Sequence, residues 1–234
     1  MLSPITTKII TILPEKLVIF IAKKITDNYL KKYANLKIEG FEKITEMSGP
    51  IIFISNHLSN SDGLVLNKLL KGKFDPYFVA GVKLTDDPIT NLGTKMVKHI
   101  AIKPNSADKE AIANMVKTVK NGENILIFPE GTRSRTGAMI EAKKGILLIA
   151  RLTKAKIIPI GLIGTNNLLP ISEGGNMGEE FWKEADVTVR FGNPVELPKR
   201  QKDEDKHLYD DNCMNVIMKS IAKLLPEENR GVYK

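Results

Sequence analysis

The chain has 234 residues, of which 42% are hydrophobic and 26% are charged, so it can bury one sizeable core and lacks the composition of a disordered protein. Its 35 basic residues outnumber its 27 acidic residues and give a formal net charge of +8, which favours an anionic partner: nucleic acid, an acidic membrane surface or a phosphate-bearing substrate. The single cysteine, Cys213, excludes an intramolecular disulfide and is compatible with a reducing, cytoplasmic setting.

The first 33 residues differ in character from the rest of the chain. Between Glu15 and Tyr33, apolar residues recur at helical spacing, namely Leu17, Val18, Ile21, Ala22, Ile25 and Tyr29. Lysines lie among them, namely Lys16, Lys23, Lys24, Lys31 and Lys32. This pattern is typical of an amphipathic helix in a membrane interface, and a helix that packs on the protein's own core gives it too. The apolar stretch 9–22 is interrupted at 14–16 and is too short to span a bilayer, which takes about 20 residues.

After this segment, short apolar runs alternate with amphipathic ones. Strands are predicted over residues 36–39, 51–55, 77–80, 100–102, 125–128, 157–163 and 187–191, and helices over 63–70, 89–98, 106–120, 142–153 and 206–225. Ser106 is expected to cap the third of these helices, and Asn121-Gly122 to end it. The alternation predicts a single α/β domain over residues 34–234, with a mixed, mostly parallel sheet flanked by helices, preceded by a membrane-binding segment, 1–33.

A histidine and an aspartate five residues apart form the first candidate catalytic pair. His57 and Asp62 follow the strand at 51–54, which is apolar on both faces. Residues five apart are separated around a regular helix, so the two side chains meet most easily if His57 lies in a turn and Asp62 opens the next helix. Such an aspartate orients the imidazole and stabilises the imidazolium that forms when histidine accepts a proton. An ordinary loop histidine beside a helix carboxylate has the same spacing.

The apolar strand at 125–128 is followed by four candidate binding residues, Glu130, Gly131, Thr132 and Arg133. Pro129 cannot donate a ladder hydrogen bond and therefore ends the strand. Gly131 permits a sharp turn, after which Thr132, Arg133 and Ser134 present hydrogen-bond donors from one loop. The planar guanidinium of Arg133 suits phosphate oxygens, although an arginine exposed in a strand-to-loop turn gives the same pattern.

Together, His-x4-Asp and the Phe-Pro-Glu-Gly-Thr-Arg-Ser sequence at 128–134 resemble the glycerolipid acyltransferase family, which includes 1-acylglycerol-3-phosphate and glycerol-3-phosphate acyltransferases. Residues 99–103 and 157–160 occupy the places of the family's second and fourth blocks, so the resemblance covers about residues 36–198. It implies that His57 and Asp62 are catalytic. It also implies that the acceptor is bound by the residues of the second motif, Glu130, Gly131, Thr132 and Arg133, with Lys103 assisting.

One position departs from the family pattern. The second block usually ends in an arginine that helps to hold the acceptor's phosphate, and here that residue is Lys103. Lysine keeps the charge but loses the bidentate geometry of a guanidinium. Phosphate recognition is still expected, while the identity of the acceptor stays open.

The resemblance implies transfer of a fatty acyl group from acyl-CoA or acyl-carrier protein to the free hydroxyl of 1-acylglycerol-3-phosphate, giving phosphatidic acid for phospholipid biosynthesis. The expected place is the cytoplasmic face of an anionic membrane, and no cofactor is implied. The alternatives are the same chemistry on glycerol-3-phosphate or another lysolipid, and a non-catalytic protein that binds anionic lipid. The sequence does not identify the donors that stabilise the oxyanion of the intermediate, and backbone amides near the His57 turn are candidates.

Other functions lack their sequence features. The chain contains no phosphate-binding P-loop, no dinucleotide fingerprint and no Gly-x-Ser-x-Gly elbow. Its three histidines and one cysteine have no metal-ligand spacing, so no metal site is expected. Only the charge supports nucleic-acid binding, which is therefore not expected. His99, His207, Cys213 and Trp182 are interpreted as structural.

Overall fold

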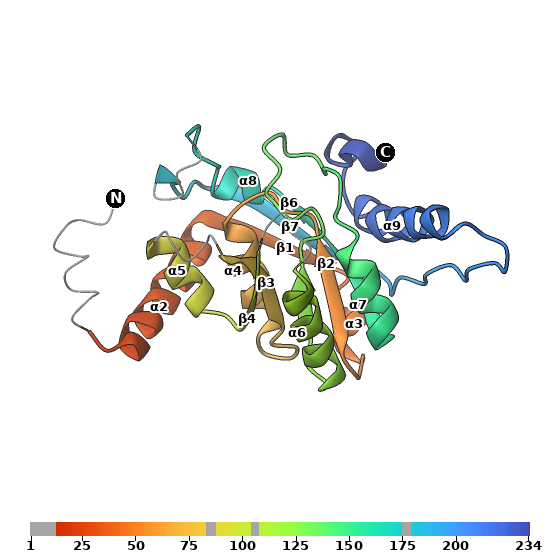
Figure 1. Ribbon diagram of the computed structural model, residues 1–234. Helices are drawn as coiled ribbons and strands as arrows, with labels where there is room; N and C mark the ends of the chain where they lie inside the picture. Colours follow the sequence, from red (N-terminus) through yellow and green to blue (C-terminus); the bar gives the residue numbers. More distant parts are fainter. Residues whose placement is uncertain (1–12, 83–87, 104–107, 175–178) are drawn as a thin grey trace.

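A seven-stranded sheet forms the centre of the computed structural model, which describes residues 13–82, 88–103, 108–174 and 179–234 (Figure 1). The strand order is β1-β7-β6-β2-β5-β3-β4, and every neighbouring pair is parallel except β6 and β7. The strands are β1 (Ala34–Glu39), β2 (Ile51–Ser55), β3 (Tyr77–Gly81), β4 (His99–Ile102), β5 (Ile125–Ile127), β6 (Lys156–Ile163) and β7 (Ala185–Phe191). The predicted mixed, mostly parallel α/β sheet is confirmed, including all seven of its strands.

The longer helices also match the prediction. They are α2 (Glu15–Tyr33), α4 (Ser61–Leu70), α5 (Pro88–Lys95), α6 (Lys109–Lys120), α7 (Gly145–Thr153) and α9 (Lys206–Ala222). The sequence did not predict the shorter helical turns, because four or fewer residues show no helical periodicity. These turns are α3 (Glu42–Thr45), α8 (Thr165–Leu168), η3 (Glu227–Asn229) and η4 (Gly231–Tyr233).

Helix α6 begins two residues later than the capping prediction required. Ser106 lies outside the described residues, and the N-cap is Asp108, whose side chain accepts the backbone N–H of Ala111 at 3.0 Å. The helix ends at Lys120 with Asn121 as its C-cap, as predicted, and Gly122 follows in the left-handed region with φ of 87°.

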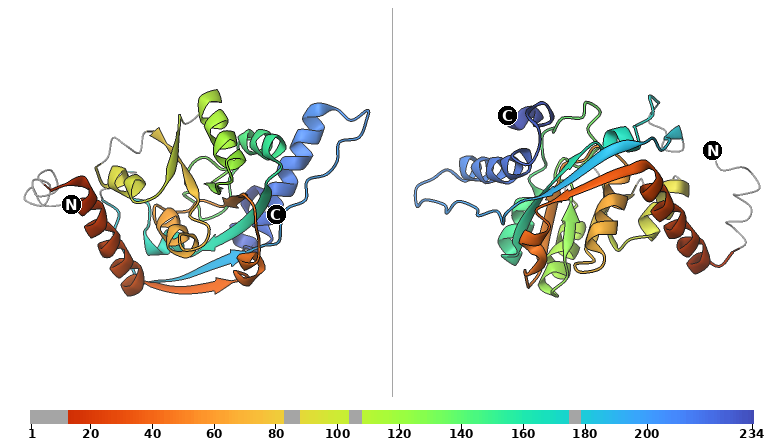
Figure 2. Two further views of the ribbon diagram at one scale, coloured as in Figure 1. Left: turned by 90° about the horizontal axis from the view of Figure 1, so that it is seen from below. Right: turned by 180° about the vertical axis from the view of Figure 1, so that it is seen from behind.

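Strand β2 lies in the middle of the sheet and is covered by helices on both faces. Ile52 and Ile54 belong to a core cluster with residues of α6, α7 and α9, whereas Ile51 and Phe53 belong to a second cluster with residues of α4 and β7. Because successive side chains of a strand point to opposite faces, a strand in this position is apolar throughout. The chain between β7 and α9 projects from the body of the molecule in both views of Figure 2.

The topology brings several chain segments to one edge of the sheet. β2, β5, β3 and β4 run parallel, so their carboxyl ends, and the residues that follow them, lie at the same edge. β6 is parallel to β2, and β7 runs opposite to β6, so β7 begins at the edge where β2 ends. β1 pairs in parallel with β7, with Ala34 opposite Ala185. The beginning of β1, and therefore the end of α2, lies at this edge as well.

Candidate active site

His57 and Asp62 are in direct contact at the carboxyl end of β2. The Nδ1 atom of His57 lies 2.8 Å from Oδ2 of Asp62. As predicted, His57 lies in the turn and Asp62 is in the first turn of α4. The side chain of His57 is 21% exposed, whereas that of Asp62 is fully buried. A neutral imidazole that donates Nδ1–H to this carboxylate has an unprotonated Nε2, which is the atom that can accept a proton from a substrate.

The same carboxylate also shapes the turn that carries His57. Oδ2 of Asp62 accepts the backbone N–H groups of Leu58, at 2.6 Å, and Ser59, at 2.9 Å. The backbone N–H of His57 donates to Oε1 of Glu130 at 2.9 Å. These three amides are therefore occupied by carboxylates. The expectation that backbone amides of this turn stabilise an oxyanion is wrong for His57, Leu58 and Ser59.

Glu130 is buried beneath the turn, with only 1% of its surface exposed. Its second oxygen, Oε2, accepts the backbone N–H of Ile140 at 2.9 Å, so both carboxylate oxygens have backbone donors. Burial raises the pKa of Glu130 to about 7, against the opposing effect of these two donors, and the nearby charge of Asp62 contributes in the same direction as burial. The acceptor-binding role that the resemblance implies for Glu130 stays a prediction, and the structure shows its carboxylate bridging the His57 turn and the segment at Ile140.

Two further residues of the second motif contact His57. The ring of Phe128 stacks on the imidazole, with centroids 4.1 Å apart and planes at 17°. The backbone N–H of Ser134 donates to the carbonyl oxygen of His57 at 2.7 Å. Phe128 and Ser134 were not predicted as site residues, although both belong to the motif that carries the resemblance. The motif after β5 therefore fixes the ring and the backbone of His57.

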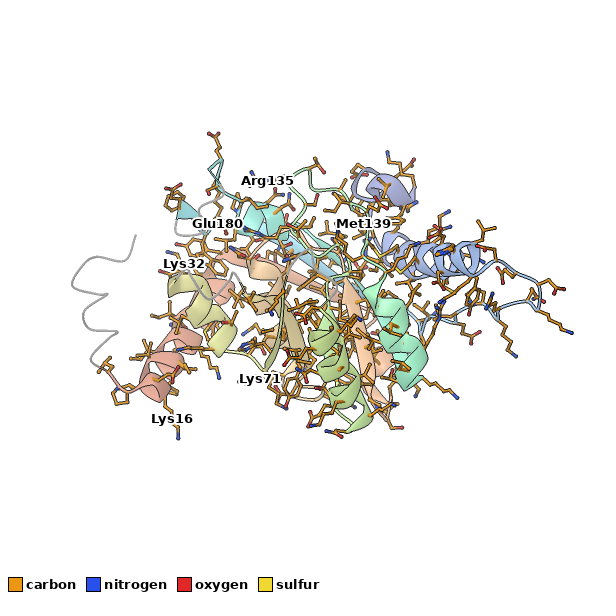
Figure 3. All side chains as sticks on the ribbon, viewed as in Figure 1. Lys16, Lys32, Lys71, Arg135, Met139 and Glu180 are labelled. Carbon is orange, nitrogen blue, oxygen red and sulfur yellow. The ribbon has the colours of Figure 1, made fainter. Side chains whose placement is uncertain are left out.

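Arg133 reaches the same region from the second motif. Its Nη1 atom donates to Oε1 of Glu180 at 2.6 Å, and Oε2 of Glu180 accepts Nδ2–H of Asn60 at 2.7 Å. Glu180 precedes β7 and is labelled in Figure 3. The sequence did not predict its role, because nothing local links it to either motif. Gly131 adopts a φ of 71°, which explains the glycine in this turn, and Thr132 is exposed.

Lys103 lies farther from the catalytic pair. It follows β4, the edge strand, and β3 lies between β4 and β5. Since neighbouring strands are about 4.8 Å apart, the ends of β4 and β5 are separated by roughly 10 Å. Lys103 is exposed, and its backbone N–H donates to the carboxylate of Asp108 at 2.8 Å. The structure thus brings His57, Asp62, Glu130 and Arg133 together and leaves Lys103 at one side.

The remaining sequence interpretations concern metals, membranes and single residues. Among the described residues, no group of three or more His, Cys, Asp or Glu side chains is placed to hold a metal ion. Within the same ranges, no helix is both long and apolar enough to cross a bilayer. His99 and His207 are exposed, Cys213 is buried in the core, and Trp182 packs against Tyr29 with ring centroids 5.6 Å apart.

Comparison with known proteins identifies the class to which this fold and this histidine–aspartate pair belong. Residues 35–163 match the model of the acyltransferase family. Because the match covers more than half of the 234 residues, the chain belongs to the acyltransferase family.

The individual relatives that the chain resembles carry more specific names. The chloroplastic 1-acyl-sn-glycerol-3-phosphate acyltransferase of Arabidopsis thaliana is 29% identical over 67% of this chain and 44% of its own length. The enzyme of the same name from Borreliella burgdorferi is 31% identical over 56% of this chain and 52% of its own. The crystal structure of the 1-acyl-sn-glycerophosphate acyltransferase PlsC from Thermotoga maritima shares the fold, with a TM-score of 0.62 and 23% identity over 90% of this chain and 81% of that one. The chain spans about half the length of these two sequence relatives.

Proposed function

We propose that the chain is an O-acyltransferase that moves a fatty acyl group from a thioester to the free hydroxyl of 1-acylglycerol-3-phosphate, giving phosphatidic acid. The observation that carries this proposal is the 2.8 Å contact between His57 Nδ1 and Asp62 Oδ2 in a member of the acyltransferase family, since it leaves Nε2 as a base. The names of the relatives support this acceptor. The donor is acyl-CoA or acyl-carrier protein, and the net charge of +8 suits the phosphate of either.

In the proposed reaction, Nε2 of His57 takes the proton of the acceptor hydroxyl as its oxygen attacks the thioester carbonyl carbon. Asp62 holds the ring and stabilises the imidazolium. The tetrahedral intermediate collapses by breaking its C–S bond, and the imidazolium returns the proton to the departing thiolate. The new ester is formed without an acyl-enzyme. Arg133 and Lys103 bind the acceptor's phosphate, and Glu130 positions His57.

We further propose that residues 1–33 form a membrane-binding segment at the cytoplasmic face. Val18 and Leu30 of α2 are buried against the body of the protein. Other apolar side chains of α2 face outward, namely Leu17, Phe20, Ile21, Ile25 and Tyr29. Lys16 and Lys32 mark the two ends of this helix in Figure 3. Exposed apolar residues beside lysines suit the interface of an anionic membrane. Packing on the core and binding to a membrane thus use different residues of one helix.

Two alternative functions are a different acceptor, glycerol-3-phosphate or another lysolipid, and lipid binding without catalysis. Glycerol-3-phosphate also offers a hydroxyl and a phosphate, and Lys103 replaces the arginine usual in the second block. A non-catalytic protein that binds anionic lipid would use the exposed residues of α2 and Arg133 without any chemistry. An acceptor screen with labelled acyl-CoA and acyl-carrier protein separates the two enzymatic possibilities by their products. The non-catalytic alternative predicts no thioester-dependent product at all.

His57→Ala and Asp62→Asn provide the direct test. Removal of a general base lowers turnover about a hundredfold to ten-thousandfold, so His57→Ala should be nearly inactive at normal thermal stability. Asp62→Asn should lose a comparable amount and also some stability, because Asp62 accepts the N–H groups of Leu58 and Ser59. His207→Ala, which changes an exposed histidine of α9, serves as the control. Near-normal turnover by His57→Ala would contradict the mechanism.

A further inference from the structure

We propose that Glu180 is a positioning residue for the acceptor's phosphate: it holds the guanidinium of Arg133 in place and ties it to the loop that carries His57. This inference rests on the proposed function, because it concerns an acceptor that is bound by Arg133 and deprotonated by His57. Glu180 lies 47 residues after Arg133 and 120 residues after Asn60, outside both sequence motifs.

The carboxylate of Glu180 forms a bridge between the two motifs. Its Oε1 atom accepts from Arg133 Nη1 at 2.6 Å, and its Oε2 atom accepts from Asn60 Nδ2 at 2.7 Å. Asn60 lies between His57 and Asp62, so one end of the bridge is attached to the catalytic loop. The side chain of Glu180 is 2% exposed, and that of Arg133 is 13% exposed. Burying a carboxylate to this degree is costly unless it is paired, and both oxygens of Glu180 accept hydrogen bonds.

Glu180 is itself held from outside the two motifs. The backbone N–H of Lys183 donates to the carbonyl oxygen of Leu168, the last residue of α8, at 2.9 Å. Trp182 packs edge-on against Tyr29 of α2, with centroids 5.6 Å apart. The residues that follow Glu180 are thereby held by α8 and by α2. A rigid support of this kind can determine where the flexible side chain of Arg133 lies.

The proposed reaction requires a fixed distance between the phosphate-binding group and the general base. An acceptor whose phosphate is held at one point and whose hydroxyl must meet Nε2 of His57 reacts only if the two points are correctly spaced. Glu180 engages one terminal nitrogen of Arg133, and a guanidinium has five N–H donors, so donors are left for a phosphate. The bridge to Asn60 therefore fixes the position of the phosphate-binding group relative to the general base.

A second interpretation of the bridge predicts the opposite change in the KM of phosphorylated acceptors. A carboxylate next to Arg133 also repels a phosphate, so Glu180 could oppose acceptor binding. If repulsion dominated, neutralising Glu180 would strengthen the binding of phosphorylated acceptors. If positioning dominates, the same substitution weakens it. The sign of the change in KM decides between the two.

A double-substitution cycle with Glu180→Gln, Arg133→Gln and the combined variant tests the proposal. KM is measured for 1-acylglycerol-3-phosphate and for a phosphate-free monoacylglycerol, with thermal midpoints as a check of folding. We expect Glu180→Gln to raise the KM of the phosphorylated acceptor about tenfold, in the range of a lost charge-assisted hydrogen bond, and to leave the phosphate-free acceptor unchanged. The combined variant should be no worse than Arg133→Gln alone, because Glu180 acts through Arg133. The matched control is Glu184→Gln, which changes an exposed glutamate of the same segment.

The possible failures are distinguishable. If Arg133→Gln affects both acceptors equally, Arg133 does not bind phosphate, and this part of the proposed function is wrong. If Arg133→Gln is selective but Glu180→Gln has no effect, lowers KM or adds fully to Arg133→Gln, the positioning role is overturned and the proposed function stands. Should Glu180→Gln unfold at the assay temperature, Glu180→Asp replaces it. Asp keeps the charge but shortens the side chain, so positioning predicts the same selective rise in KM, and unchanged KM would overturn the proposal.

Discussion

Around His57, separate neighbours control the ring and the backbone. Asp62 fixes the tautomer through Nδ1, and Phe128 holds the ring plane by stacking. Glu130 and Ser134 bind the backbone N–H and the carbonyl oxygen of the same residue. A general base is effective only within hydrogen-bond reach of the proton that it abstracts, so the precision of the turn matters as much as the imidazole. Glu130 and Ser134 both come from the motif after β5, so this motif positions the backbone of the residue that the first motif supplies.

The buried carboxyl of Glu130 leads to a prediction about stability and pH. Its folded-state pKa of about 7 lies above the ordinary value of 4.5. Between these two values the folded protein binds more protons than the unfolded chain, so the free energy of unfolding falls as pH rises. This contribution is fully present below pH 4.5 and is lost as pH rises through 7. We expect a loss of about 2 kcal/mol between roughly pH 5 and pH 8, measured by urea denaturation.

Glu130→Gln should remove this part of the pH dependence. Its absolute stability should be lower at every pH, because an amide offers only one acceptor oxygen to two backbone N–H groups. The slope of stability against pH is therefore the quantity to compare. Glu141→Gln, a change at an exposed neighbour, should keep the slope of the parent. An unchanged slope in Glu130→Gln would mean that Glu130 stays ionised in the folded protein.

At the scale of elements, regular structure was predictable because it depends on local patterns. The runs that became β2 and β5 are apolar on both faces, which only a covered strand satisfies. The length of α2 follows from its apolar spacing, and the end of α6 from Asn121-Gly122. The helices α3 and α8 were missed because four residues carry no periodic signal.

The candidate site was predictable only where a motif holds its residues together. His57 and Asp62 are five residues apart, and their contact follows from a turn and a helix start. The contact between Arg133 and Glu180 joins residues 47 apart and depends on the tertiary path of the chain before β7. The bracing contacts of Glu130 were not predictable for a related reason: sequence shows a carboxylate in a binding motif but not that backbone N–H groups occupy both of its oxygens.

Helix α2 carries the prediction at this scale. Deleting it would also remove Val18 and Leu30 from the core, so substitutions of its exposed apolar residues are a cleaner test. Phe20→Ser combined with Ile25→Ser should weaken binding to vesicles containing phosphatidylglycerol at least about tenfold, since a buried large apolar side chain contributes about 1.5–3 kcal/mol. High salt should weaken binding of the parent protein through its lysines. Co-sedimentation measures both effects.

A matched control is available on α7. Leu148 and Leu152 are exposed to a similar degree as the α2 residues, at 46% and 49%, but belong to a different helix. Leu148→Ser with Leu152→Ser should leave vesicle binding unchanged. Equal loss in both pairs would indicate nonspecific apolar adsorption. No loss in the α2 pair would mean that α2 serves only to pack on the core.

Across the whole molecule, the sheet topology decides which distant residues can act on one substrate. The parallel strands β2, β5 and β4 bring their carboxyl ends to one edge, together with the end of α2. The site and the proposed membrane-binding helix therefore meet at the same edge, where a lipid acceptor would arrive. Lys103 follows the outermost of these strands, so its contribution depends on how far the acceptor extends along the edge.

This placement yields the last prediction. Long side chains from strand ends roughly 10 Å apart can converge on one phosphate, so Lys103→Ala should raise the KM of phosphorylated acceptors about tenfold or more. Lys103→Arg should retain activity because the charge survives. Arg133→Lys should be less tolerated, since a lysine cannot hold a phosphate and Glu180 with the geometry of a guanidinium. The measurement is KM for 1-acylglycerol-3-phosphate, glycerol-3-phosphate and a phosphate-free lysolipid in each variant.

Lys109→Ala, at the exposed beginning of α6, controls for the loss of one positive charge near the same edge and should change none of the three values. A rise in KM for both phosphorylated acceptors but not for the phosphate-free one would place the phosphate between Lys103 and Arg133. A rise for 1-acylglycerol-3-phosphate alone would put Lys103 beside a part of the acceptor that glycerol-3-phosphate lacks. If Lys103→Ala and Arg133→Lys impair the phosphate-free lysolipid equally, neither residue recognises phosphate. The proposed acceptor class would then be wrong, while the role of His57 and Asp62 would stand.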